Sequence, residues 1–278
     1  MDYALVADSS CELTAEIKET IPSAGVPLTM TAGGKEYVDD ERLDVDAFLR
    51  DIENSRDTPR SSCPSPEDYA NAFAASPAEK VFAVTLSSKL SGSYTSAMIG
   101  SKLEQARGKT VHIFDSKSAS AGETLTALKI AELAGLKADF QTIVEETQRF
   151  INNMKTFFVL ENTDIMVKNG RMNPLLGKAL GLLNIRLILG SDGEGSIKLF
   201  SKARGAATAL HRLAETVTEN RAGASGGRLV ITHCMNPQGA AALAGEVREA
   251  CRFDGVDLLQ TSGLSSMYAS RGGIIAAF

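Results

Sequence analysis

Serine hydroxyls follow several short apolar runs that are typical of buried strands. Asp8-Ser9-Ser10, Ser87-Ser88 and Asp115-Ser116 each come directly after such a run and shortly before a helical pattern. In open α/β sheets, ligands bind at the carboxyl ends of the strands. Hydroxyls and free backbone N–H groups at helix starts bind anions together. The pattern therefore indicates a hydroxyl-rich edge of the sheet that could hold a carboxylate or a phosphate.

Two serine pairs are the main candidates for contact with that anion. Ser61-Ser62 lies in the loop 60–66, and Ser91 and Ser93 lie in the exit from the strand 80–86. A single serine in such a turn is explained by helix N-capping alone. Two clusters on the same predicted edge favour an anion-binding cleft lined with neutral donors.

Catalysis by one of these serines is a competing hypothesis. A G-x-S-x-G nucleophile elbow is absent, and the spacing of His112, His211 and His233 pairs none of them with Ser91 or Ser93. The histidines are typical of structural positions, with His211 on a surface. A serine-dependent hydrolase or acyltransferase stays open, as does a binder of another small anion.

Metal and nucleotide cofactors have little support in the sequence. The four cysteines are scattered without a zinc-binding spacing, and 39–41 is an acidic run typical of a solvated face. The segment 170–178 differs from a phosphate-binding loop in spacing, and no Ser or Thr follows Lys178. We therefore expect no cofactor and no metal.

The bulk composition is that of a folded globular protein. The 278 residues are 44% hydrophobic and 23% charged, and the net charge of −5 without a basic run argues against nucleic acid. No basic segment opens the chain, and no apolar run approaches the ~20 residues of a membrane helix. We expect a cytoplasmic protein with no integral membrane segment.

The order of the predicted elements indicates an α/β protein with two domains. Strands alternate with helices in the first half, which predicts parallel pairing in a three-layer α/β/α domain over 1–155. The runs 183–189 and 196–200 flank a Gly-rich turn and predict a hairpin. A hairpin among βα units indicates a mixed sheet, so we expect a two-layer domain over 156–278.

The serine motifs in their order resemble the DegV family. Ser61-Ser62-Cys63-Pro64-Ser65 and the most specific stretch, Ser88 to Tyr94, lie in the first half of the chain. Asn169-Gly170-Arg171, Leu183-Asn184-Ile185 and Lys202-Ala203-Arg204 extend the likeness through the second half.

The resemblance implies two α/β domains with a long-chain fatty acid buried between them. It implies that hydroxyls of the loops matching Ser61, Ser62 and Ser91-Gly92-Ser93 hold the carboxylate, with Ser61 and Ser93 foremost. Some members of the family are the acyl-carrying subunit of a bacterial fatty acid kinase, whose separate ATP-binding subunit phosphorylates the carboxylate. Arg171 and Arg204 would then face this partner, and the chain itself would not be an enzyme.

Two departures from the family pattern affect the predicted site. Cys63 stands where relatives commonly have Gln. Many relatives also end with a His-x-Gly-Pro-Gly segment whose histidine reaches the carboxylate, whereas the stretch 266–273 of this chain has no histidine. We expect Tyr268, Ser270 or Arg271 to replace it, and an arginine would give a charge-assisted bond.

Overall fold

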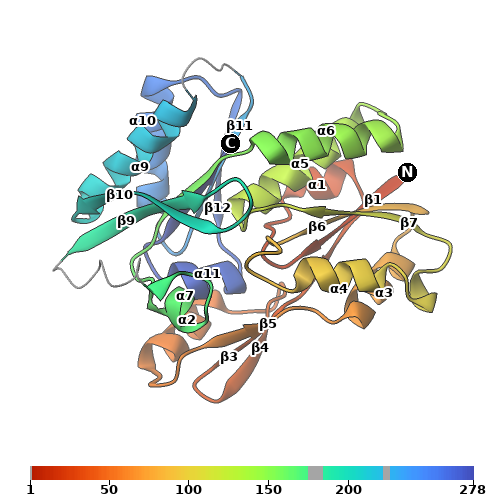
Figure 1. Cartoon of the computed structure of the whole chain (residues 1–278), viewed down its shortest axis with the longest axis horizontal. Coiled ribbons are helices and arrows are strands. Elements are labelled where there is room, and N and C mark those ends of the chain that lie inside the picture. Colours follow the sequence, from red (N-terminus) through yellow and green to blue (C-terminus); the bar gives the residue numbers. More distant parts are fainter. Residues whose placement is uncertain (1, 175–183, 222–225) are drawn as a thin grey trace.

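Two large β-sheets and one small sheet form the framework of the protein (Figure 1). The computed structural model describes residues 2–174, 184–221 and 226–278. The predictions for Lys178 and Leu183 fall outside these residues. The small sheet has the order β4-β3-β5, and the large sheets belong to the two halves of the chain.

The first large sheet contains four parallel strands in the order β2-β1-β6-β7. These strands are β1 (Tyr3–Asp8), β2 (Ser23–Val26), β6 (Lys80–Thr85) and β7 (Thr110–Asp115). Helices α1 (Ala15–Thr20), α5 (Ala121–Gly135) and α6 (Phe140–Asn153) cover one face, and α3 (Pro66–Ala75) and α4 (Ser93–Gly100) cover the other. The predicted three-layer arrangement with a parallel sheet is confirmed.

The small sheet is antiparallel and lies beside the first large sheet. It contains β3 (Thr29–Ala32), β4 (Lys35–Val38) and β5 (Arg60–Ser62), and α2 (Val45–Asn54) connects β4 to β5. The sequence prediction treated 60–66 as a loop, which is wrong for its first three residues. Such a short polar segment has no alternation of its own, and only its pairing with β3 makes it a strand.

The second large sheet is mixed and has the order β10-β9-β8-β13-β11-β12. Its strands are β8 (Thr156–Val159), β9 (Ile185–Ser191), β10 (Ile197–Arg204), β11 (Arg228–His233), β12 (Gly255–Gln260) and β13 (Ile274–Ala277). The predicted hairpin is the antiparallel pair β9 and β10. Helices α9 (Ala206–Arg221) and α10 (Pro237–Ala250) pack on one face, while α7 (Asp164–Lys168) and α11 (Gly263–Ala269) lie near the opposite face.

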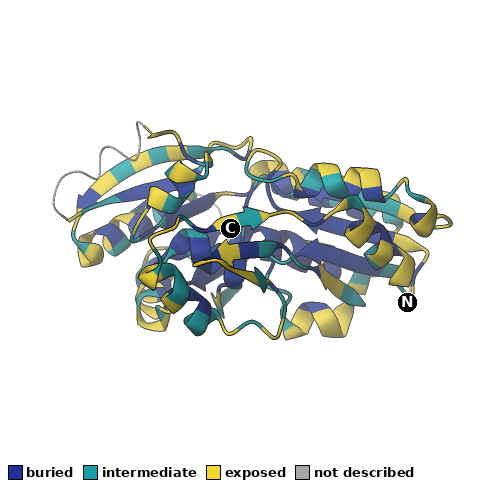
Figure 2. Ribbon diagram, turned by 90° about the horizontal axis from the view of Figure 1, so that it is seen from below, coloured by how far each residue is buried: buried dark blue, intermediate teal, exposed yellow. Residues whose placement is uncertain are grey.

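Helix α5 contacts both large sheets and joins the two halves of the chain. Its Leu125 and Leu128 pack with the first sheet, and Val230 and Ala277 of the second sheet belong to the same apolar cluster. Most residues of α5 are buried, including the polar Glu123 and Thr126. Figure 2 shows that burial extends through the middle of the molecule, where the strands are largely dark blue. The division of the chain at 155 and 156 into separate domains stays a prediction.

Local sequence signals set the ends of several elements. Thr14 caps α1 by accepting from the Ile17 N–H, and Ser65 forms a capping box with Asp68 at the start of α3. Gly170 follows α7 with a φ of 73°, a left-handed conformation that glycine adopts easily at a helix end. The Ser65 capping box thus fixes the end of the loop that carries Ser61 and Ser62.

Candidate functional site

A cavity of about 370 Å³ lies between the carboxyl edge of the first sheet and a face of the second. Most of its wall is apolar. The larger apolar lining residues are Leu28, Leu86, Leu90, Phe158, Leu160, Met166, Ile197, Leu264 and Ile275, and Ala119 and Ala269 lie among them. Ligand cavities of roughly 300–1,000 Å³ with mostly apolar walls and a few polar groups hold small organic molecules.

Hydroxyl groups from separate loops line the same cavity. The predicted residues Ser61, Ser62, Ser91 and Gly92 are part of its wall, and so is Tyr268. The Ser61 and Tyr268 hydroxyls are 3.1 Å apart, which joins β5 to α11 across 207 positions of sequence. Together these residues form a wall of neutral donors that can bind an anion without a fixed counter-charge.

The turn after β6 places Ser91 at the cavity. The N–H groups of Leu90 and Ser91 donate to the Ser87 carbonyl at 2.9 and 3.0 Å, which folds the segment tightly before α4 begins. Gly92 precedes the first residue of α4, and a Cβ there would lie 3.0 Å from Cys63 Sγ. A side chain at this position would crowd Cys63, which also lines the cavity.

Ser93 is placed differently from Ser91. It is fully buried and does not belong to the cavity wall. Its hydroxyl lies 3.0 Å from that of Ser91, and its N–H donates to the same Ser91 oxygen at 3.2 Å. Ser93 therefore stands behind Ser91, and the structure gives it a contact with the residue that faces the cavity.

Of the three residues expected to replace the missing histidine, the structure brings only Tyr268 to the cavity. Ser270 ends α11 with a φ of 56° and does not line the wall. Arg271 points to α2, where its guanidinium pairs with Asp46 at 2.6 Å and Glu53 at 2.8 Å. These carboxylates hold Arg271 away from the hydroxyl wall.

The two predicted partner-facing arginines lie at different places. Arg171 lines the cavity, and its Nε donates to the Leu90 carbonyl at 3.1 Å, which attaches the segment after α7 to the serine turn. Arg204 is exposed at the end of β10 and does not line the cavity. A role of either arginine toward a partner stays a prediction.

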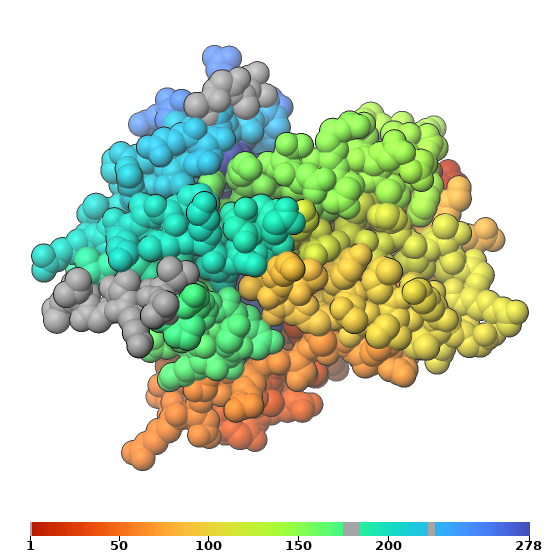
Figure 3. All heavy atoms as spheres, in the orientation of Figure 1, coloured from red at the N-terminus to blue at the C-terminus, as the bar shows by residue number. Residues whose placement is uncertain are grey.

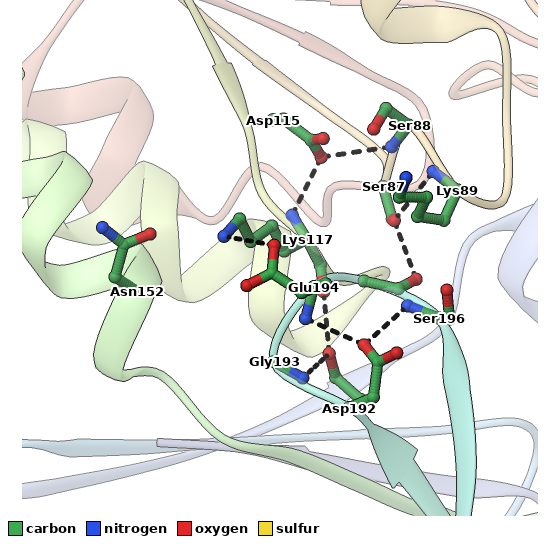
Figure 4. A network of polar contacts seen from close by, with 12 residues as sticks. Ser87, Ser88, Lys89, Asp115, Lys117, Asn152, Asp192, Gly193, Glu194 and Ser196 are labelled. Atoms are coloured by element: carbon green, nitrogen blue, oxygen red, sulfur yellow. Dashed lines mark hydrogen bonds and ion pairs between the residues drawn. The ribbon is translucent and has the colours of Figure 1, made fainter.

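The turn between β9 and β10 is part of the cavity wall, and polar contacts connect it to the loops of the first sheet (Figure 4). The Ser87 hydroxyl donates to the Gly195 carbonyl at 2.8 Å, and Lys117 pairs with Glu194 at 3.1 Å. Gly195 has a φ of 95°, and a Cβ there would lie 2.3 Å from Ser87 Oγ. In Figure 3, the teal hairpin lies against the orange-yellow segment after β6.

A pair of buried carboxyl groups lies behind the serine loops. Asp8 accepts from the N–H groups of Leu86 at 2.9 Å and Ser10 at 3.2 Å, which fixes the ends of β1 and β6 relative to each other. Glu123 is fully buried, and neither of its side-chain oxygens has a hydrogen-bond partner within ordinary distance. Burial, reinforced by the charge of Asp8, raises the pKa of Glu123 well above its usual value. Burial therefore favours the neutral form of the Glu123 carboxyl group.

Glu12 connects the start of α5 to the second half of the chain. Its carboxylate accepts from the Ser120 hydroxyl at 3.0 Å, the Thr124 hydroxyl at 3.1 Å and the Ser262 N–H at 3.2 Å. Burial raises the pKa of Glu12 to about 7, because the loss of hydration outweighs these hydrogen bonds. Glu12 therefore titrates near neutral pH.

Asp39 corrects one sequence prediction, since the acidic run 39–41 is not entirely a solvated face. Its side chain is buried and accepts from the N–H groups of Gly263 at 2.7 Å and Leu264 at 2.9 Å. It thus holds the start of α11, the helix that carries Tyr268. Within the described ranges, no group of three or more His, Cys, Asp or Glu residues could hold a metal ion.

Comparisons with known proteins identify the family. A model of the DegV family, described as uncharacterised protein, matches residues 2–276. The chain belongs to the DegV family. A DegV domain-containing protein of Streptococcus gordonii is 33% identical over 283 residues, which cover 100% of this chain and 99% of the relative.

Solved structures of DegV proteins have the same fold. A DegV family protein from Ruminococcus gnavus, refined with vaccenic acid, is 37% identical with a TM-score of 0.94 and covers 100% of this chain and 99% of its own. The Fatty Acid Kinase (Fak) B3 protein of Streptococcus pneumoniae, loaded with linoleic acid, is 32% identical with a TM-score of 0.90 and the same coverage. The α/β fold with one parallel and one mixed sheet is thus the DegV fold.

Several cavity residues of this DegV chain were not among the predicted site residues. Ser10 and Ser118 lie in or next to the strand-end motifs, so the pattern could have found them. Lys117 lines the wall beside Ser118, after the same motif. Thr156, Ser191, Ser196 and Ser265 also line it. The positions of these four depend on how the second half of the chain packs on the first sheet, and no local motif marks them.

Among the described parts of this DegV chain, none of the helices has the length and apolar character required to cross a membrane.

The three histidines of the chain do not line the cavity. His211 is exposed and contacts Glu246 at 2.7 Å, as expected for a surface residue, whereas His233 accepts from the Asn236 N–H at 3.3 Å. His112 lies in β7 against Phe114.

Proposed function

We propose that this chain binds a long-chain fatty acid in the cavity between its two large sheets. The observation that carries the proposal is a single cavity of about 370 Å³ that joins a long apolar wall to hydroxyls from Ser61, Ser91 and Tyr268. The acyl chain would lie along the apolar wall, and the carboxylate would accept hydrogen bonds from the hydroxyls. The DegV structures with vaccenic and linoleic acid support this assignment.

The physical chemistry of the cavity suits this ligand. Each buried methylene contributes about 0.8 kcal/mol, so a sixteen-carbon chain supplies roughly 10 kcal/mol before the costs of ordering. A desolvated carboxylate requires hydrogen bonds, because burying it without a partner costs several kcal/mol. Neutral hydroxyls meet that requirement and leave the carboxylate free to react with a partner.

Presentation of the bound acid to a separate fatty acid kinase subunit is the second part of the proposal. The Streptococcus pneumoniae protein named as part of such a kinase supports it. Arg171 beside the cavity and the exposed Arg204 would contact the partner. A cytoplasmic location, where ATP is available to such a kinase, fits this role.

A serine hydrolase or acyltransferase would need a base beside Ser91 or Ser93. No histidine of the described chain lines the cavity. The buried Asp8 interacts with the Ser93 hydroxyl, but it also accepts from the N–H groups of Leu86 and Ser10, and Ser93 does not line the cavity. The geometry therefore favours binding of the acid over attack on an ester.

The decisive experiment is mass spectrometry of material extracted from the purified protein, followed by titration of the delipidated protein with palmitate. We expect about one fatty acid per chain in both measurements. The same protein should not release p-nitrophenol from an acyl ester faster than its Ser93→Ala variant. A phosphorylated metabolite in place of the fatty acid, or ester turnover that depends on Ser93, would contradict the proposal.

A further inference from the structure

A second, polar pocket of about 330 Å³ adjoins the hydroxyl wall of the cavity. Its lining residues are Thr58, Arg60, Ser61, Lys168, Asn169 and Arg171. Ser61 and Arg171 line both the cavity and this pocket, so the two spaces meet at these residues. Half of the lining residues of the polar pocket are cations, although the chain as a whole has a net charge of −5.

The cations of this pocket have no carboxylate partner. Within residues 2–174, 184–221 and 226–278, none of the ion pairs includes Arg60, Lys168 or Arg171. Like charges that line one pocket repel each other, and an anion relieves this repulsion. Arg and Lys are also the side chains that bind phosphate groups.

Hydrogen bonds hold the two walls of the pocket together. Asn169 Nδ2 donates to the Pro59 carbonyl at 2.9 Å, which ties the end of α7 to the segment before β5. The carbonyls of Ile165 and Met166 at the end of α7 accept from the N–H groups of Asn169 and Arg171 at 3.0 and 2.8 Å. Because these carbonyls are already bonded, they are less available to oppose an anion in the pocket.

We infer that this polar pocket binds the phosphoryl group of an acyl phosphate whose acyl chain occupies the cavity. The inference rests on the proposed function. During phosphorylation, a carboxylate oxygen of the bound acid forms a bond to the γ-phosphorus of ATP. The bond from that phosphorus to the β–γ bridging oxygen breaks, and ADP leaves with the electron pair. The phosphoryl group then extends beyond Ser61, and the polar pocket is the space that adjoins Ser61.

Binding of a non-hydrolysable analogue tests the inference. The probe is the long-chain β-ketophosphonate in which a methylene replaces the bridging oxygen of the acyl phosphate, compared with the matching fatty acid. We expect the Arg60→Gln/Lys168→Gln double variant to lose at least about tenfold in phosphonate affinity, the effect of lost charge-assisted bonds. Its fatty acid affinity should stay within about twofold of the parent protein.

The control is an Lys155→Gln/Arg252→Gln double variant, which removes two exposed cations elsewhere. It should retain the phosphonate affinity. Equal phosphonate affinity of the pocket variant and the parent protein would overturn the inference while the proposed function stands. Binding of ATP or inorganic phosphate alone with the affinity of the phosphonate would also overturn it. Failure of the parent protein to bind fatty acid would overturn the proposed function and this inference together.

Discussion

The two large sheets contribute opposite chemistry to one cavity. The first sheet presents its carboxyl edge, where loops supply Ser10, Ser91 and Ser118. The second sheet presents a face, from which Phe158 of β8 and Ile275 of β13 enter the wall. An edge leaves N–H groups and hydroxyls available for a ligand, whereas the backbone of a sheet face is already paired between strands.

This difference separates two properties that a lipid-binding site requires. The face of the second sheet provides apolar area, which determines most of the affinity for an acyl chain. The edge of the first sheet provides hydrogen-bond donors at fixed positions, which determine where the carboxylate end of the acyl chain lies. The following predictions test this separation, from the largest expected effect to the smallest.

Filling the apolar part of the cavity should have the largest effect. Ala119 lines the cavity, and we expect Ala119→Phe to displace about four methylenes of the acyl chain. At ~0.8 kcal/mol each, the loss is about 3 kcal/mol, or roughly a hundredfold in fatty acid affinity. Fluorescence titration with a labelled fatty acid measures it. The exposed Ala74→Phe on α3 is the control, and unchanged affinity in a folded Ala119→Phe protein would contradict the proposed position of the chain.

Removing hydroxyls from the edge should have a smaller effect. We expect Ser91→Ala and Ser93→Ala each to weaken fatty acid binding by about 1–3 kcal/mol, because each change leaves a buried polar group unsatisfied. Since Ser93 acts through Ser91, the double variant should be no weaker than Ser91→Ala alone, which isothermal titration can measure.

Thr95→Ala, an exposed change on α4, provides the comparison for these serine variants. Additive losses in the double variant would show that Ser93 contacts the ligand directly. An unaltered affinity of Ser93→Ala would remove Ser93 from the site altogether.

The half-buried carboxyl group of Glu12 should make folding depend on pH. Its pKa is raised in the folded protein to about 7, so its contribution to stability is complete below the unfolded pKa and is lost as the pH rises to about 7. The shift corresponds to roughly 3 kcal/mol, and the partial exposure of Glu12 reduces the expected loss to about 1–2 kcal/mol.

Urea unfolding at about pH 5 and pH 8 measures this loss. We expect Glu12→Gln to lose less free energy of unfolding between these two pH values than the parent protein does, because glutamine does not ionise. The exposed Glu132→Gln should behave as the parent does. An equal loss in Glu12→Gln and the parent would contradict the raised pKa.

Arg271 should have the smallest effect on the ligand. Its ion pairs with Asp46 and Glu53 place it outside the cavity, so we expect Arg271→Ala to change fatty acid affinity by less than about twofold. The free energy of unfolding should fall by about 0.5–1 kcal/mol, as for a partly exposed pair. A tenfold loss of affinity would show that the guanidinium reaches the carboxylate when the ligand is bound.

Sequence patterns predicted much of the fold because the decisive signals are local. The parallel pairing of the first half and the hairpin of β9 and β10 were both predicted from local patterns. The serine-rich edge also followed from local motifs, because parallel strands bring their carboxyl ends to one side. The approximate place of the site was therefore predictable.

The remaining details depend on contacts between distant segments. Strand β5 exists because it pairs with β3, and Asp39 is buried because α11 begins beside it. Likewise, Arg271 points toward α2 because it forms ion pairs with Asp46 and Glu53 of that helix. No motif near Arg271 reveals these partners. Which of Ser91 and Ser93 faces the cavity is decided by the tight turn and the start of α4.

Helix α5 limits how the protein can exchange its ligand. Because one buried helix packs against both sheets, rotation of one half away from the other would expose Leu125 together with Val230 and Ala277. Opening about a hinge requires an interface that can separate at low cost. We therefore expect a bound fatty acid to exchange through a local displacement of a surface segment, such as the turn between β9 and β10, which a few polar contacts hold.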